Sequence, residues 1–221
     1  MADIVNRVND MLSLKEVNKE EAIRLNKELC KEYPFLACDV NIWTGKKRLD
    51  YDYSYTWYDD LPSGWRVAFG EMLLEELTSL LDKANFKDKY EISQIKEKYG
   101  SLRWYSNGVP AVISDEYHTL MSKYENLSGA ICICCGKPDV RSTTGWITPV
   151  CYDCWKNMVA YKGNDDMLTH KDYLLDTTEP DRMPDKIRWS RYNGQEWKTE
   201  EVDISETADK IREAWRQRVG L

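Results

Sequence analysis

Five of the chain's seven cysteines fall within residues 132–154, which read CICCGKPDVRSTTGWITPVCYDC. Cys132 and Cys135 are separated by two residues, and this spacing recurs in a second pair after an interval of fifteen residues. Each C-x2-C turn directs two sulfurs toward one point, and two such turns supply the tetrahedral ligand set of a structural zinc site. The sequence therefore predicts that Zn²⁺ is bound by Cys132, Cys135, Cys151 and Cys154.

Cys134 complicates this assignment, because Cys132 and Cys134 form a rival pair. Cys135 is preferred since it reproduces the spacing of the later pair and precedes Gly136, where a turn often needs positive φ. Redox C-x-x-C motifs usually open a helix in a thioredoxin-like βαβ unit, and this sequence has no βαβ rhythm. An iron–sulfur cluster also uses four cysteines, so the spacing leaves iron as an alternative to zinc.

The role expected for the metal is structural. Four thiolates fill the coordination shell of zinc, whereas a catalytic zinc keeps one position for water. The H-x-E motif of base deaminases is absent. Cys154 precedes WKNMVAYK, which can form a helix, and Gly145-Trp146 could bend a short hairpin between the pairs. These features predict a treble-clef-like module over residues 130–162 that the metal holds folded.

A second group of side chains that could bind a ligand lies in ISQIKEKYGSLRWYS, residues 92–106. Extended backbone over residues 92–98 places Lys96 and Lys98 on one face, together with Gln94. Cations beside aromatic rings can bind phosphate or stack bases. The alternative is a solvated strand face whose cations pair with neighbouring acids. The candidate partner-binding residues are Lys96, Lys98, Arg103, Trp104 and Tyr105, of which Trp104 is expected to face the other way.

Motifs for catalysis are scarce. The chain has two histidines, His118 and His170, and neither stands in a catalytic motif. No G-x-S-x-G, Walker-type or dinucleotide fingerprint occurs. Asp59-Asp60 could bind a divalent cation, although a cap or turn role is the favoured interpretation. Because no nucleophile, base and orienting group come together, we expect that the protein is not an enzyme.

The charge distribution disfavours nucleic acid as the partner. The chain of 221 residues carries a net charge of −7. Residues 1–130 hold 22 acids and 17 bases, residues 131–175 hold five of each, and residues 176–221 hold 11 and nine. A nucleic-acid-binding protein usually shows a basic footprint, and no segment is basic overall.

The location expected for the chain is the cytoplasm. The N-terminus, MADIVNRVNDMLSLKEVNKEEA, lacks the apolar region of a signal peptide. No apolar run approaches the ~18 residues of a membrane-spanning helix, so no membrane partner is expected. Cytoplasmic thiols stay reduced, which argues against structural disulfides.

Helices and hairpins are predicted in separate blocks. Asn18 can cap a helix that ends before Pro34, and a wide apolar stripe predicts a helix over 65–84. Further helices are expected over 114–127 and from Ser205, as its cap, to Val219. Hairpins are predicted over 36–57, where Leu49, Tyr51, Tyr53 and Tyr55 alternate with polar residues, over 90–106 with a turn at 98–101, and over 186–204 around Asn193-Gly194.

These elements predict an α+β fold in which helices and β-hairpins surround one core, with a treble-clef-like zinc module and a C-terminal hairpin–helix. The expected boundaries are an N-terminal α+β domain over 1–129, the four-cysteine zinc module over 130–162, a polar linker over 163–185 and a C-terminal β-hairpin plus helix over 186–221.

Three stretches together resemble a known group of proteins. They are TWYDDLPSGWRVAFGE, ISQIKEKYGSLRWYSNG and the cysteine-rich segment quoted above. This order is similar to that of an uncharacterised protein family of bacteriophage and prophage genomes, with a K-E-K-x-G-x-L-R-x-Y hairpin followed by a four-cysteine module. The resemblance covers about residues 55–155 and implies a phage-type origin without an assigned activity. Cys134 departs from the usual single pair.

The acid excess, the closed metal site, the Trp- and Tyr-bearing hairpins and the resemblance together predict a function. We expect a zinc-stabilised, non-enzymatic phage-type interaction protein that binds and modulates a host macromolecule, with a protein of an antiviral defence system as the expected target. The alternative is a nucleic-acid-binding accessory protein that uses Lys96, Lys98 and Arg103.

Overall fold

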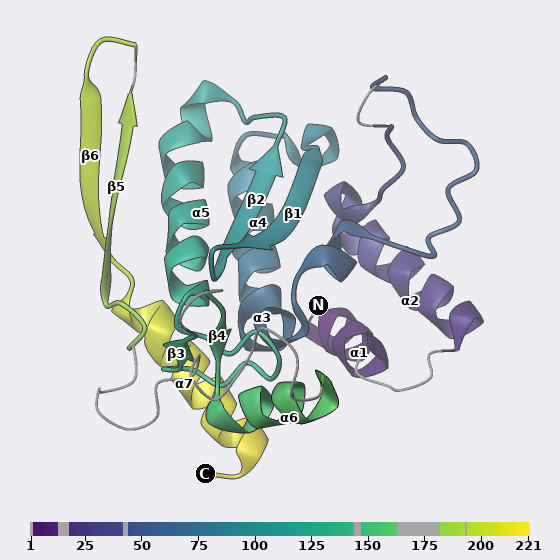
Figure 1. Cartoon of the computed structure of the whole chain (residues 1–221). Coiled ribbons are helices and arrows are strands. Elements are labelled where there is room, and N and C mark those ends of the chain that lie inside the picture. The colour runs from purple at the N-terminus through teal and green to yellow at the C-terminus, as the bar shows by residue number, and fades with distance from the viewer. Residues whose placement is uncertain (1, 13–17, 42–43, 144–146, 163–181, 193) are drawn as a thin grey trace.

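Two helices, α4 (Glu71–Lys83) and α5 (Ser114–Ser128), form the centre of the fold (Figure 1). This computed structural model describes residues 2–12, 18–41, 44–143, 147–162, 182–192 and 194–221. The hairpin formed by β1 (Ile92–Lys98) and β2 (Ser101–Ser106) crosses one face of the helix pair. Helices α1 and α2 lie on one side, and the C-terminal hairpin lies on the other. The predicted α+β class is confirmed.

The remaining elements follow in chain order. The other α-helices are α1 (Ala2–Leu12), α2 (Lys19–Glu32), α3 (Ser63–Trp65), α6 (Tyr152–Lys162) and α7 (Ser205–Val219). The strands are β1 (Ile92–Lys98), β2 (Ser101–Ser106), β3 (Arg141–Ser142), β4 (Pro149–Val150), β5 (Lys186–Tyr192) and β6 (Trp197–Asp203). Within the described residues they pair as three two-stranded antiparallel sheets, β1–β2, β3–β4 and β5–β6.

Leucines spaced three or four residues apart give α4 its buried face. Leu77 and Leu81 are fully buried there, and Tyr124 and Leu127 of α5 are fully buried as well. Burying one such side chain contributes about 1.5–3 kcal/mol, so this helix pair anchors the main core. Hairpin β1–β2 covers the pair with the inward-facing residues Ile92, Ile95, Leu102 and Trp104.

The predicted helix over 65–84 is interrupted, because residues Arg66–Gly70 form a π-helix between α3 and α4. A Cβ at Gly70 would collide with the Tyr58 hydroxyl, which donates a hydrogen bond to Asn9 Oδ1 at 3.0 Å. The Asn9 amide in turn donates to the carbonyl of Arg66 at 3.3 Å. Tertiary contacts from two distant segments thus set this irregularity, which the local sequence does not show.

The hairpin predicted over residues 36–57 is wrong. Of the described residues in this stretch, only isolated bridges form, between Ala37 and Thr56 and between Val40 and Lys47. The backbone turns at Tyr53, whose φ is 62°, and the rings of Tyr51 and Tyr53 pack on each other 4.5 Å apart. The alternating tyrosines therefore do not form one face of a sheet.

Helix α1 was not predicted from the sequence. Its buried residues are Ile4, Val5, Val8 and Met11, which recur at the three- and four-residue spacing of an amphipathic helix. Helix α2 begins where predicted, because the Asn18 side chain accepts hydrogen bonds from the backbone N–H groups of Glu20 and Glu21.

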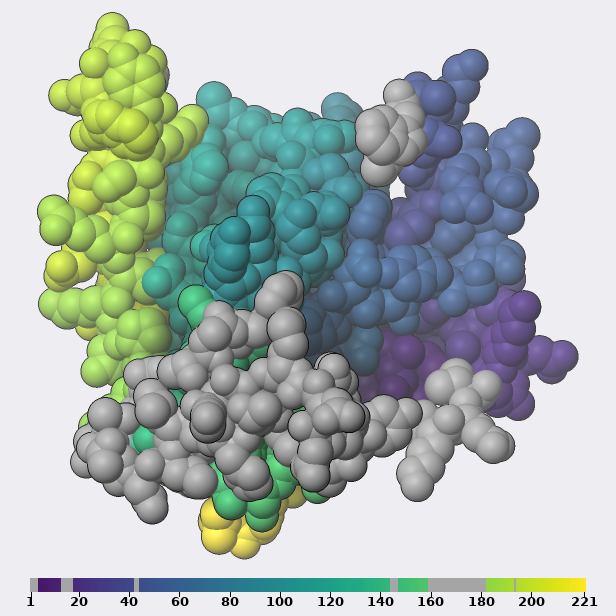
Figure 2. All heavy atoms as spheres, viewed as in Figure 1, coloured from purple at the N-terminus to yellow at the C-terminus, as the bar shows by residue number. Residues whose placement is uncertain are grey.

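The C-terminal hairpin and helix share the main core. Strand β5 buries Ile187 and Trp189, and α7 buries Ala208 and Ile211. Asn193 and most of the predicted linker, residues 163–181, lie outside the described residues, whereas Met183 near the linker's end is buried. Helix α7 starts at Ser205, so the prediction of Ser205 as its cap is wrong: Ile204 holds the cap position without a side-chain capping bond. The Ser205 N–H instead donates to Asp203 Oδ1 at 2.9 Å. Figure 2 shows the tip of hairpin β5–β6 standing at the edge of the molecule.

Candidate metal centre and the charged surfaces

The four predicted cysteines come together in space. The sulfurs of Cys132, Cys135, Cys151 and Cys154 all lie within 4.8 Å of one another, and those of Cys135 and Cys151 are 3.8 Å apart. A tetrahedral site with metal–sulfur bonds of 2.3 Å separates its sulfurs by about 3.8 Å. The cluster therefore has the donor type, number and spacing to hold a metal ion.

Backbone hydrogen bonds shape the first pair of ligands into a knuckle. The Cys132 N–H donates to the carbonyl of Lys137 at 2.8 Å, and the Gly136 N–H donates to the carbonyl of Cys132 at 2.9 Å. Gly136 has a φ of +79°, so the positive φ predicted after Cys135 is confirmed. This tight turn brings the first two sulfurs together.

The second pair stands at the start of α6, where the Cys154 N–H lies 3.5 Å from Cys151 Sγ. Strands β3 and β4 pair between the two cysteine pairs, with Arg141 opposite Val150. Knuckle, hairpin and helix follow in the order of a treble clef, which matches the predicted arrangement. The proposed bend at Gly145-Trp146 lies outside the described residues.

The cluster sits in a small core of its own. The buried residues there are Cys132, Val140, Val150, Cys151 and Trp155, and they form a cluster separate from the main core. So few side chains bury too little apolar surface to balance the conformational entropy of ordering the module. A metal bound to the four thiolates would supply that stability.

A short stretch before α4 fastens the knuckle to the main core. The Gly64 N–H donates to the carbonyl of Ile133 at 2.9 Å, and Trp65 Nε1 donates to the carbonyl of Ile131 at 3.0 Å. A Cβ at Gly64 would collide with the carbonyl oxygen of Cys132 and lie 2.7 Å from the Gly136 nitrogen. Only glycine allows this close approach, because every other residue adds a Cβ.

Cys134 is exposed and is not one of the four clustered cysteines, in line with the preference for Cys135. Its sulfur lies 3.8 Å from the sulfur of Met158 on α6. Hydrogen bonds from the thiols of Cys134 and, with a smaller effect, Cys135 lower the pKa of Cys132. Burial raises the pKa of Cys154 to about 12. A divalent metal that binds the four clustered thiols would release the protons that these thiols carry.

The predicted basic and aromatic face of β1–β2 is present. Lys96 pairs with Arg103 across the strands, and Gln94 pairs with Tyr105. Its cations have local partners: Lys96 Nζ lies 5.4 Å from the Tyr105 ring centroid, and Arg103 forms an ion pair with Glu125 on α5. This is the solvated and internally paired face that was the alternative interpretation.

Two aromatic residues of this hairpin change the predicted surface. Trp104 is buried, and its Nε1 donates to the Tyr90 hydroxyl at 2.9 Å, so it belongs to the core and is removed from the candidate partner-binding residues. Tyr99 at the turn is 73% exposed and lies under Lys98, whose Nζ is 5.3 Å from its ring centroid. The short turn at Tyr99-Gly100 was the available signal for this exposed tyrosine.

The other residues considered for chemistry have structural roles. Asp59 Oδ2 accepts hydrogen bonds from the Thr56 N–H at 2.6 Å and from the Thr56 hydroxyl at 2.8 Å, so the predicted cap role is confirmed. His118 packs on Trp189 with ring centroids 6.2 Å apart, and burial lowers its pKa. His170 lies outside the described residues.

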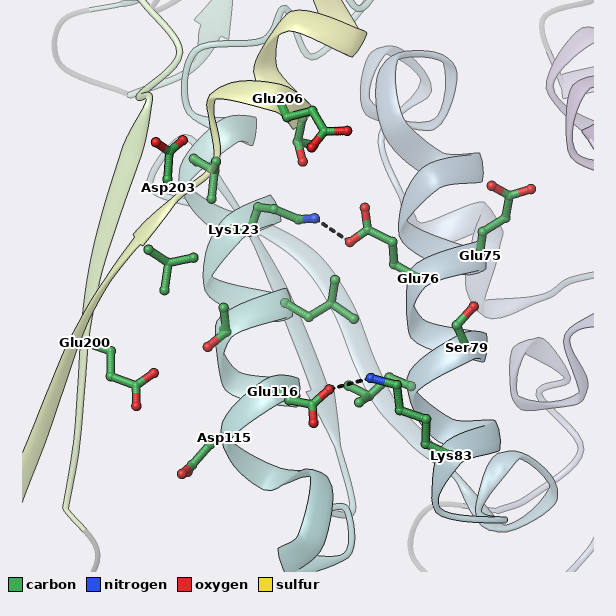
Figure 3. Close-up of a pocket in the computed structure, with 16 residues that line it drawn as sticks. Glu75, Glu76, Ser79, Lys83, Asp115, Glu116, Lys123, Glu200, Asp203 and Glu206 are labelled. Atoms are coloured by element: carbon green, nitrogen blue, oxygen red, sulfur yellow. Dashed lines mark hydrogen bonds and ion pairs between the residues drawn. The ribbon is translucent and has the colours of Figure 1, made fainter.

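An acidic groove lies over α4, α5 and the segment from β6 into α7 (Figure 3). Its volume is about 710 Å³, and its lining includes two lysines, Lys83 and Lys123. The carboxylates of the lining are Glu75, Glu76, Asp115, Glu116, Glu200, Asp203 and Glu206. This feature was not predicted from the sequence, because its acids come from four separate elements, α4, α5, β6 and α7.

No helix among the described residues combines the length and the apolar character needed to cross a membrane. Comparisons of the chain with models of protein families, with curated proteins and with solved structures found no match.

Proposed function

We propose that this protein is a zinc-stabilised, non-enzymatic interaction protein that binds and modulates a host macromolecule. The observation that carries the proposal is the closed cluster of four cysteine sulfurs within 4.8 Å of one another. Four thiolates satisfy zinc and leave no position for a substrate or a water, so the metal would stabilise a fold instead of performing catalysis. Thiolate ligands require a reducing compartment, and the cytoplasm of the host cell is the proposed location.

The surface supports a protein partner for this chain. The acidic groove carries seven carboxylates and two lysines in its lining, and such a field attracts basic partners and repels nucleic acid. The resemblance to phage and prophage proteins supports a bacterial target, and we propose a protein of an antiviral defence system. An acidic protein can occupy the basic channel in which a defence protein holds nucleic acid.

Affinity capture from bacterial lysate tests the proposal. The zinc-loaded chain is immobilised, and the lysate is divided into nuclease-treated and untreated halves. We expect a stoichiometric protein in both halves, identified by mass spectrometry. Recovery of nucleic acid, with proteins lost after nuclease treatment, would contradict the proposal, and so would the absence of any enriched protein.

The second candidate function is nucleic-acid binding by hairpin β1–β2. It is favoured by the shared face of Lys96, Arg103 and Tyr105. Binding there would weaken steeply with salt, with a slope of about −0.7 per neutralised phosphate on single strands. A Lys96→Ala, Lys98→Ala, Arg103→Ala variant that still captures the same protein would separate this candidate from the protein partner.

A further inference from the structure

We propose that the acidic groove is the docking site for a lysine- and arginine-rich amphipathic helix of the partner protein. This inference rests on the proposed interaction function and names the chemistry of the partner at one surface. It is carried by the geometry of α4 and α5, by the apolar floor between them and by the charge of the rim.

The two helices present a preformed and braced surface. Glu76 of α4 pairs with Lys123 of α5, and seven residues further along α4 Lys83 pairs with Glu116 at 2.7 Å. The paired numbers rise on one helix and fall on the other, so α4 and α5 run antiparallel. At 1.5 Å per residue the two bridges stand about 10 Å apart along the helices, roughly two helical turns.

Apolar side chains contribute to the floor of the groove, beside one serine and two threonines of the lining. Leu80 of α4 and Leu120 of α5 belong to the lining, and by sequence position each lies between the two bridges, which Figure 3 marks as dashed ion pairs. Val202 and Ile204 complete the lining from the side of β6. Two turns of an incoming helix would place apolar anchors at positions i, i+3 or i+4 and i+7 on such a floor.

The rim is acidic on both sides of this floor. Glu75 stands on the outer side of α4, and Glu200 and Asp203 stand on the side of β6 (Figure 3). The lining has seven acids against two lysines, a net charge of −5. Counting the neighbouring cations Arg191, Lys198 and Lys210, which pair with Asp115, Glu200 and Glu206, still leaves seven acids against five bases.

The existing ion pairs of the rim do not block a basic ligand. Glu206 and Lys210 pair on the solvent-exposed surface of α7, with side chains 83% and 63% exposed. Exposed pairs of this kind contribute about 0–1 kcal/mol, so carboxylates can exchange them for cations of a ligand at little cost. A row of lysine or arginine side chains flanking the apolar anchors would meet the rim on both sides.

Charge excludes the occupants that the chain itself could provide. Residues 163–181 hold six acids and one lysine, which gives this segment the same sign as the groove. A second copy of the chain carries a net charge of −7. A helix with an apolar stripe and basic flanks satisfies both the floor and the rim, whereas a purely polar polycation satisfies only the rim.

Peptide binding to the zinc-loaded full chain tests the inference. The probe is a labelled Leu/Lys peptide of about four helical turns with leucines at i, i+3, i+4 and i+7. Two control peptides are used: one has the same composition in scrambled order, and the other is a Leu/Glu peptide with the same pattern of leucines. Fluorescence anisotropy at low and moderate salt measures the affinities, and spermine is added as a competitor.

Two charge-matched variants localise the binding. The groove variant is Glu75→Gln, Glu200→Gln, Glu206→Gln, and the control is Glu20→Gln, Glu91→Gln, Glu213→Gln, whose glutamates are exposed and outside the lining. Both variants gain three units of charge, so a long-range field alone would affect them equally. We expect the amphipathic Leu/Lys peptide to bind the control like the original chain and the groove variant about tenfold more weakly.

Three outcomes would overturn the inference. The first is equal affinity of the amphipathic and scrambled peptides for the chain. The second is an equal loss of peptide affinity in the groove variant and the control variant. The third is displacement of the peptide by spermine added at the same total positive charge as the peptide. Affinity capture from lysate distinguishes failure of the docking inference from failure of the proposed interaction function. A protein captured equally by the original chain and the groove variant removes the groove but keeps the interaction function, whereas peptide binding without any captured protein removes the interaction function.

Discussion

The cysteine module and the C-terminal hairpin–helix contact each other, yet they are stabilised in different ways. The module buries Trp155 and a few neighbours in a separate cluster around four sulfurs. The C-terminal unit instead inserts Ile204, Ala208 and Ile211 into the main core. One appendage can therefore be stabilised by a metal ion held by its four sulfurs, and the other depends on the core that it shares.

The contact between the two units is polar. Arg212 of α7 donates to Asp139 through Nε at 2.9 Å, and the Met183 N–H donates to the same carboxylate at 2.8 Å. Arg218 donates to the carbonyl of Cys135. Such bonds orient the module against α7, but each contributes only about 0.5–3 kcal/mol and cannot replace either source of stability. Loss of the metal and loss of core packing should hence have separable effects.

Removal of the metal is expected to have the largest effect. Binding of zinc to four thiolates is worth on the order of 10–16 kcal/mol, and Cys151→Ser or a strong chelator removes all or much of it. We expect residues 130–158 to lose protection in hydrogen exchange, while α5 and β5–β6 keep theirs. Unchanged metal content and an unchanged melting temperature in Cys151→Ser would contradict the expectation that a metal bound by the four sulfurs stabilises the module.

Cys134→Ser is the matched control for that experiment. Its sulfur is exposed and lies outside the cluster of four. We expect full metal content and an unchanged melting temperature, measured by elemental analysis and by thermal unfolding. A loss of metal in this variant as large as in Cys151→Ser would mean that Cys134 is a ligand.

Truncation of the shared core is expected to have the next largest effect. Ile211 of α7 is 1% exposed, and Ile211→Ala removes buried methyl and methylene groups at a cost of about 2–5 kcal/mol. Since this core also holds α4 and α5, we expect denaturant unfolding of the whole domain to shift. The metal content of the folded protein should stay unchanged, and release of the metal alone would show that α7 belongs to the module.

The cysteine site could be predicted because its information is local. Two C-x2-C pairs and Gly136 sit within one segment, and the spacing of ligands reflects the geometry of the metal itself. The hairpin β1–β2 was also predicted, because alternation of apolar and polar residues and the turn at Gly100 lie within a single short stretch.

Features made by distant segments could not be predicted in this way. The acidic groove joins Glu75, Asp115 and Glu200, which lie on three elements, and no pattern along the chain connects them. The alternation around Tyr51 and Tyr53 resembled a strand, but these rings pack on each other and the stretch has no partner strand among the described residues. Side-chain packing overrode the local pattern.

Gly64→Ala is expected to loosen the module without removing its ligands. The added Cβ would collide with the carbonyl oxygen of Cys132, and overpacking of this kind costs about 1–3 kcal/mol. We expect a lower melting temperature and faster transfer of zinc to a chromogenic chelator. Gly129→Ala is the control, since its Cβ would come no closer than 3.6 Å to any atom. Equal rates of zinc transfer in the two variants would show that the close contact at Gly64 of α3 does not stabilise the knuckle.

The smallest effect is expected at the contact between the two units. Burial favours the neutral form of Asp139, but hydrogen bonds from Arg212 and from the Met183 N–H outweigh it and hold the pKa of this carboxyl below its usual value. At neutral pH the pair is ionised, and Arg212→Gln should cost about 1 kcal/mol, because the pair is partly solvated. The variant should keep its metal and the protection of its main core, with faster hydrogen exchange confined to residues 137–142 and 182–185. A loss of metal comparable to that in Cys151→Ser would show that the C-terminal unit, and not the four sulfurs, holds the module together.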